Sequence, residues 1–106
     1  MVTAAPLRDE AQIAMLTLLG PLPGTAYHLK KAIVVQVERD EGGSFVVSEA
    51  NTGAFHYDND LSRAVAGFVG AFVDEFEFLV HNEGSLSPAL ISDLERFRIL
   101  VEPSAE

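Results

Sequence analysis

The stretch that decides the fold is residues 61–81, LSRAVAGFVGAFVDEFEFLVH. Its apolar residues recur at steps of three and four, which is the spacing of one face of an α-helix. Asp60 stands at the N-cap position, where a carboxylate accepts hydrogen bonds from free backbone N–H groups, and the polar residues 82–84 end the segment. The pattern predicts a long helix with Phe68 and Phe72 central in its apolar stripe. The stripe comprises Leu61, Ala64, Val65, Phe68, Phe72, Phe76 and Leu79.

Three short segments that precede this helix have the composition of β-strands. Residues 31–38 are rich in valine and place Gln36 and Glu38 on the face opposite the odd-numbered residues. Asp40-Glu41-Gly42-Gly43 is typical of a tight hairpin turn, and residues 44–48 predict the returning strand. Residues 54–58 place Phe55 and Tyr57 on one face, with His56 and Asp58 on the other. The segments predict a three-stranded antiparallel meander.

Both ends of the chain predict further helices. Residues Leu7–Leu19 have helical spacing and stop at the Pro/Gly segment 20–24, which we interpret as a linker. Ser87-Pro88 resembles a helix start, because it is a capping residue followed by proline at the first helical position. Residues 103–106 are expected to form a frayed tail. The expected fold class is therefore α+β, a three-stranded antiparallel meander packed by a long helix, with extra N-terminal and C-terminal helices.

The length and composition bound the organisation and the function. A chain of 106 residues suits one domain, 1–106, which divides into the N-terminal helix and linker (1–24), a β-β-β-α core (25–81) and a C-terminal helix and tail (82–106). Zero cysteines exclude disulfides, thiol nucleophiles and thiolate zinc sites. No apolar run approaches a membrane span, and no signal peptide is apparent. We expect a cytoplasmic protein without membrane contact.

The charge of the chain is strongly negative and unevenly distributed. The net charge is −9, which counts against nucleic acid as a direct ligand. Residues 1–53 carry four basic and six acidic side chains, and residues 54–106 carry three basic and ten acidic ones. The acidic second half could steer a basic partner, or its charge could serve only solubility.

Residues 32–79 resemble the HicB-type antitoxin domain. The resemblance rests on the strand 33–38 (IVVQVE), the acidic-glycine hairpin 40–43 and the second strand 45–48, which ends in Val-Ser. A glycine-led strand, GAF, and an acidic turn then precede the long helix. Where the family usually has Gly-Asp-Thr and Glu-Glu-Ala, this chain has Asp58-Asn59-Asp60 and Ser62-Arg63-Ala64, so the packing alanine is kept.

The resemblance implies an antitoxin, or an antitoxin-derived regulatory module, that acts by protein–protein binding and neutralises a small basic ribonuclease toxin. Many such antitoxins carry a DNA-binding segment after the domain, whereas this chain has one acidic helix after His81, so direct nucleic-acid binding is not expected. The alternatives are a stand-alone acidic inhibitor or nucleic-acid mimic and, third, a metal-dependent hydrolase.

Two groups of polar residues are candidates for a site. His56, Asp58 and Asp60 alternate at the end of a strand and could bind a transition metal, or could serve the turn and the helix cap. Asp74, Glu75 and Glu77 lie off the apolar stripe, where they form either a solvated face or a recognition surface. We predict partner binding at Asp74, Glu75, Glu77, Asp58 and His56.

No catalytic or cofactor motif is found. The serines lack a nucleophile-elbow context, and the chain contains neither a phosphate loop nor a dinucleotide fingerprint. We therefore expect a protein that is not an enzyme and that takes no cofactor.

A small-residue face on the long helix indicates a close neighbour. Ala66, Gly67, Gly70 and Ala71 allow another backbone to approach, either the last helix, the N-terminal helix or a second subunit. A sheet of three strands also has an exposed edge, which proteins normally cover or pair. We therefore expect a homodimer.

Overall fold

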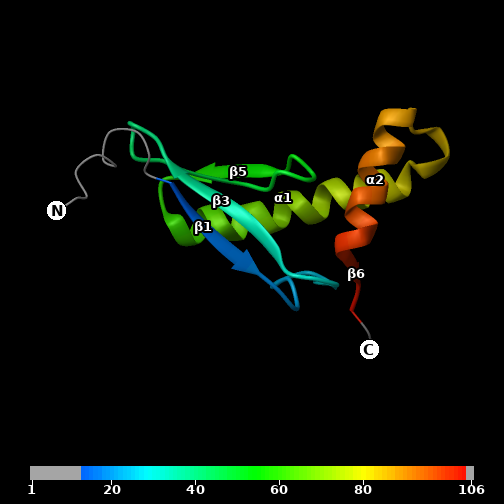
Figure 1. Ribbon diagram of the computed structural model, residues 1–106, viewed down its shortest axis with the longest axis horizontal. Coiled ribbons are helices and arrows are strands. Elements are labelled where there is room, and N and C mark those ends of the chain that lie inside the picture. The colour runs from blue at the N-terminus through cyan, green and yellow to red at the C-terminus, as the bar shows by residue number, and fades with distance from the viewer. Residues whose placement is uncertain (1–12, 105–106) are drawn as a thin grey trace.

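The computed structural model describes residues 13–104 and has an α+β fold (Figure 1). Its main sheet is antiparallel, with the strand order β1-β3-β4-β5. A second, two-stranded sheet pairs β2 with β6. The strands are β1 (Ile13–Leu18), β2 (Tyr27–Leu29), β3 (Ile33–Arg39), β4 (Phe45–Ser48), β5 (Phe55–Asp58) and β6 (Val101–Pro103).

The predicted meander is confirmed as β3, β4 and β5. Gln36 pairs with Ser48 and Arg39 with Phe45, so the hairpin closes through residues 40–44. Gly43 has a φ of 91° in this turn, a conformation that glycine adopts without steric cost. The inward residues Val35 and Val47 are fully buried, as the alternation of the sequence predicts.

The sheet has a fourth strand where the sequence predicts a helix. Residues 13–18 form β1, which pairs along its whole length with β3, and the rest of the predicted helix, residues 7–12, lies outside the described residues. A short apolar run suits either element, because its hydrophobic pattern alone does not fix the period. Here β3 offers a row of backbone partners, and Leu16 and Leu18 pack against the core as strand residues.

Two α-helices complete the fold. Helix α1 (Leu61–His81) begins at Asp60, whose side chain accepts a hydrogen bond from the Arg63 N–H at 2.9 Å, as predicted. A 3-10 turn, η2 (Glu83–Ser85), leads to helix α2 (Pro88–Leu100). The Ser87 side chain caps α2, and Pro88 occupies its first turn, which is the start that the sequence indicates.

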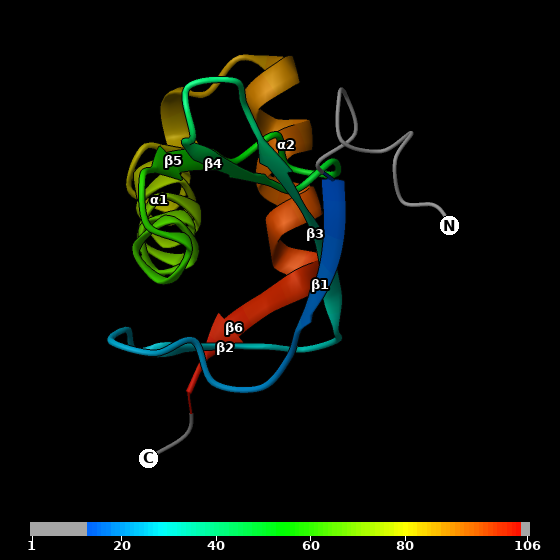
Figure 2. The ribbon, with the colours of Figure 1, turned by 90° about the vertical axis from the view of Figure 1, so that its left-hand side faces the viewer.

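Helix α1 lies against the inner face of the sheet under β4 and β5, as Figure 2 shows. Helix α2 crosses the second half of α1. Phe68 and Phe72, the residues expected at the centre, are 1% and 0% exposed. The Phe72 ring lies 5.0 Å from the ring of Phe97 in α2, and Phe76 lies 5.8 Å from the same ring. The stripe of α1 therefore joins the sheet to α2.

The segments expected to be a linker and a frayed tail both pair with β2. Leu22 is buried within residues 20–24, and the Leu29 N–H donates to the Gly20 carbonyl at 2.8 Å. Strand β6 continues directly from α2 and pairs with β2, while the Ser104 N–H donates to Ala26. Residues 20–29 and the end of α2 are thus joined through β2 and β6. Residues 105 and 106 of the expected tail lie outside the description.

Of the small-residue face of α1, Gly67 meets β5, a neighbour that the sequence did not indicate. A methyl group at Gly67 would overlap the imidazole ring of His56. A methyl group at Gly70, one turn further along, would meet no atom within 4 Å. Gly67 is therefore required for the close approach of β5 to α1, while Gly70 is not.

Phe72→Ala should leave the protein largely unfolded. Phe72 is fully buried and packs against Phe68 of α1 and Phe97 of α2. Truncating such a residue costs roughly 3–5 kcal/mol, which is a large part of the stability of a small domain. Circular dichroism during urea titration measures the effect. A soluble variant that melts within a few degrees of the parent would contradict the assigned core.

Substitutions at the two glycines should have opposite effects on the free energy of unfolding. Gly67→Ala should destabilise by about 1–3 kcal/mol, because the methyl group overpacks against His56. Gly70→Ala, the matched control, should stabilise by roughly 0.5–1 kcal/mol through helix propensity. In a His56→Ala background the penalty at Gly67 should disappear, which a double-mutant cycle in urea measures. Equal effects at both glycines would show that β5 does not lie close to α1.

Candidate protein-interaction surface

In the described part of the chain no helix lies over the face of the main sheet opposite α1, and α2 borders this face at one end (Figure 2). We call this the outer sheet face. Phe55 and Tyr57 are 59% and 64% exposed on it, Met15 is 62% exposed and Val34 is 56% exposed. Exposed apolar side chains that lie together mark interaction sites more often than scattered ones do. The outer sheet face comprises Ile13, Met15, Thr17, Val34, Gln36, Glu38, Val46, Ser48, Phe55 and Tyr57.

The strand register arranges eight of these residues in two rows across all four strands, and Thr17 pairs with Val34 beside them. Directly paired residues of antiparallel strands lie side by side on the same face. One row runs Ile13–Glu38–Val46–Tyr57, and the next runs Met15–Gln36–Ser48–Phe55. Ile13, Met15, Phe55 and Tyr57 therefore stand on the two edge strands, and the central strands between them carry Val34 and Val46 beside the polar Gln36, Glu38 and Ser48. This surface suits a partner that brings apolar side chains and a few hydrogen-bonding groups.

A groove of about 880 Å³ lies where the outer sheet face meets α2. Met15 and Val34 contribute apolar walls from the sheet, and Ile99 contributes one from α2. Lys31 and Arg96 are the two cations in the lining. The groove extends the outer sheet face, so a partner on that face would also reach α2.

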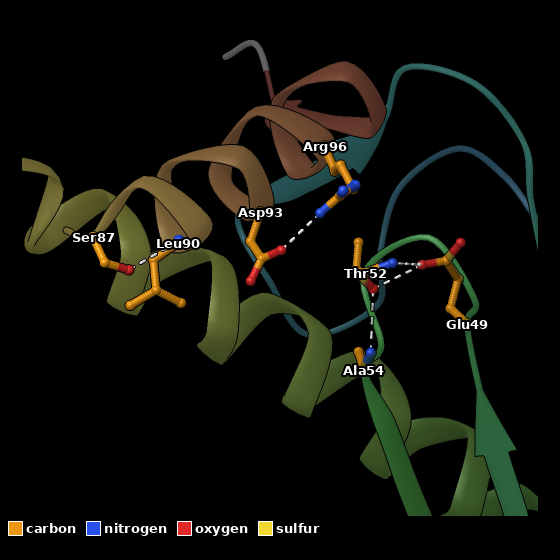
Figure 3. A network of polar contacts seen from close by, with 7 residues as sticks. All are labelled: Glu49, Thr52, Ala54, Ser87, Leu90, Asp93 and Arg96. Carbon is orange, nitrogen blue, oxygen red and sulfur yellow. Dashed lines mark hydrogen bonds and ion pairs between the residues drawn. The ribbon is translucent and has the colours of Figure 1, made fainter.

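The turn that follows β4 is held by a buried carboxylate beside this groove. Glu49 is 2% exposed, and its Oε1 accepts from the N–H and the hydroxyl of Thr52, both at 2.7 Å (Figure 3). Its Oε2 accepts from the Asn51 N–H at 3.0 Å. The Glu49 carboxylate thus fixes the turn. The nearby Arg96 instead forms an ion pair with Asp93 on α2 at 2.8 Å, also drawn in Figure 3.

Of the predicted site residues, His56 and Asp58 lie on the inner side of β5, near the start of α1. The His56 ring rests on Gly67, and the Asp58 carboxylate accepts from the Arg63 side chain at 3.1 Å and from the Asp60 N–H at 3.0 Å. The pKa of Asp58 is held below its usual value, mainly by the hydrogen bond from the Asp60 N–H and secondly by the positive charge of Arg63. Both residues join β5 to α1, and they share a face as the alternation predicts.

The three acidic residues of α1 do not form one surface. Successive helical residues are rotated by about 100°, so Glu75 points away from Asp74 and Glu77, which are i, i+3 neighbours on one side of α1. Asp74 and Glu75 are exposed, whereas Glu77 is half-buried and accepts a hydrogen bond from the Tyr27 hydroxyl at 3.0 Å. The pKa of Tyr27 is raised, mainly by burial and secondly by the hydrogen bond to the Glu77 carboxylate. Asp74 and Glu75 remain available to a partner, while Glu77 helps to attach β2.

Among residues 13–104, no three His, Cys, Asp or Glu side chains lie where they could together hold a metal ion. No helix in the same range has the length and apolar character needed to cross a membrane.

The sequence prediction missed the apolar part of the surface on β1. Ile13 and Met15 belonged to a predicted helix, so their position beside Glu38 and Gln36 was not foreseen. The alternation of Ile13, Met15 and Thr17 with Ala14, Leu16 and Leu18 was the available signal. Searches with this chain find no matching family model, no matching curated protein and no matching solved structure.

Proposed function

We propose that the chain is a protein-binding module of the HicB antitoxin kind, which recognises a small basic protein, such as a ribonuclease toxin, through its outer sheet face. The observation that carries the proposal is the exposure of Phe55, Tyr57, Met15 and Val34 on one sheet face, which no element within residues 13–104 covers. Aromatic residues and methionine are enriched in protein interfaces. The HicB resemblance of residues 32–79 supplies the class of partner.

The charge of the chain supports a basic partner. Ten acidic side chains lie in residues 54–106, and Asp74 and Glu75 are exposed on α1 outside the hydrophobic face. Such charges act mainly on the rate of encounter, while the buried apolar contact determines how long a complex lasts. The apolar face thus provides affinity and the acidic helix provides steering.

We also propose that the module works as a homodimer. The main sheet has two open edges within the described chain, β1 and β5, and open edges are normally covered or paired. A dimer would present two outer sheet faces to its partners.

The outer-face proposal is tested by removing the two aromatic side chains of β5. Phe55→Ser/Tyr57→Ser should lower partner affinity by about 30-fold or more, since central aromatic residues of interfaces contribute roughly 2 kcal/mol or more. Phe78→Ser on α1 is the matched control, because Phe78 is 57% exposed and lies outside the face. Tagged proteins are used to capture partners from the native host, and the captured basic protein is titrated against each variant by calorimetry. Equal affinity for all three proteins would contradict the proposal.

The steering role predicts a kinetic effect of the exposed acids. Asp74→Asn/Glu75→Gln should slow association with the basic partner about three-fold or more at low salt and reduce its salt dependence, with little change in dissociation. Stopped-flow mixing at two salt concentrations measures this. Glu77→Gln is the comparison, because Glu77 is bonded to Tyr27. Unchanged rates and salt dependence would show that the acidic helix serves only solubility.

A further inference from the structure

Strand β1 is an open edge of six residues without the usual protection against pairing. β3 pairs with one side of β1, and no strand of the described chain lies on the other side (Figure 1). Every second residue of such a strand points its backbone N–H and C=O outward. Edge strands are normally blunted by lysine, proline or bulges, but Ile13–Leu18 has the sequence IAMLTL and pairs with β3 in unbroken register.

Strand β1 and the segment that follows it carry no charged side chain of their own. From Ile13 to Tyr27 the chain has no charged side chain, although its net charge is −9. An acidic or basic partner would find no opposite charge there. A second copy of this chain, repelled by acids elsewhere, can approach closely at an edge that carries none.

An apolar groove of about 680 Å³ runs beneath the same edge. It lies between the inner side of β1, the segment that follows β1, and the first half of α1. None of its lining residues is charged. The lining includes Leu16, Leu18, Leu22, Leu61, Val65 and Val69.

We propose that two copies of the chain pair antiparallel through β1, which joins their main sheets into one of eight strands. This inference rests on the homodimer of the proposed function and names its interface. Antiparallel pairing of identical strands is isologous, so one two-fold axis satisfies both edges. It supplies partners for the outward backbone groups and encloses the groove from its open side.

The alternation of side chains limits the register of this pairing. Residues directly opposite each other in an antiparallel pair lie on the same face, and a shift of one residue would place apolar side chains on the wrong face. The inward residues of β1 are even-numbered and the outward ones odd-numbered. The two-fold axis therefore lies midway between two copies of the same residue. When five residues of each strand are paired, this residue is either Met15 or Leu16. In both registers the outer sheet faces of the two copies become continuous.

Introduced charges on the edge test the proposal. In Met15→Lys/Thr17→Lys, lysines of the two copies stand opposite each other in either register, and like charges directly opposite are destabilising. Both positions are exposed, so the fold should remain intact. Val34→Lys/Gln36→Lys is the matched control, because it makes the same charge change on the same face but on β3. Sedimentation over a concentration series should show dimers for the parent and the control, with the dissociation constant of the edge variant raised at least about ten-fold.

Three results would overturn the proposal. A parent that stays monomeric at micromolar concentration rules out the dimer, and an edge variant that dimerises like the parent rules out the interface. If the parent is monomeric, and its edge variant loses the basic partner while Val34→Lys/Gln36→Lys keeps it, a strand of the partner occupies β1. Loss of partner affinity in Phe55→Ser/Tyr57→Ser is measured separately, so the outer-face proposal stands or fails independently of this one.

Discussion

The packing of the aromatic stripe of α1 is the interaction on which the rest of the structure depends. Phe68 and Phe72 cover the inner face of the sheet, while Phe72 and Phe76 also contact Phe97 of α2. Tyr27 of β2 packs edge-on against Phe76, with ring centroids 5.5 Å apart. One helix thus joins the main sheet, α2 and the small β2-β6 sheet in a single core.

This use of α1 determines which surfaces remain for recognition. Both helices contribute to the core on the inner side, and Gly67 lets β5 lie close enough for His56 to touch α1. The outer side of the sheet keeps exposed Phe55 and Tyr57 with no covering element in the described chain. The polar residues first considered for a site mostly hold the fold together: Asp58 with Arg63, and Glu77 with Tyr27. Recognition is therefore expected from apolar strand residues.

Residues 31–81 could be predicted from the sequence because their local signals agree with their packing. The stripe of α1, its Asp60 cap and the glycine hairpin each indicate one conformation. Residues 13–18 could not be predicted, since the conformation of this six-residue apolar run depends on pairing with β3, which is distant in the sequence. The short strands β2 and β6 could not be predicted either, because each forms only by pairing with the other. The placement of Phe55 and Tyr57 on one face was predictable. That this face stays uncovered depends on the path of α1 and on β1, which local sequence does not encode.

The central claim is that the sheet has one face for folding and one for binding. The most direct measurement is methyl NMR of the chain with and without its captured basic partner. The account predicts large shift changes for the methyl groups of Met15 and Val34 on the outer sheet face, and small ones for Val35 and Val47, which are buried beneath α1. Changes confined to residues of α1, with Met15 and Val34 unaffected, would contradict it.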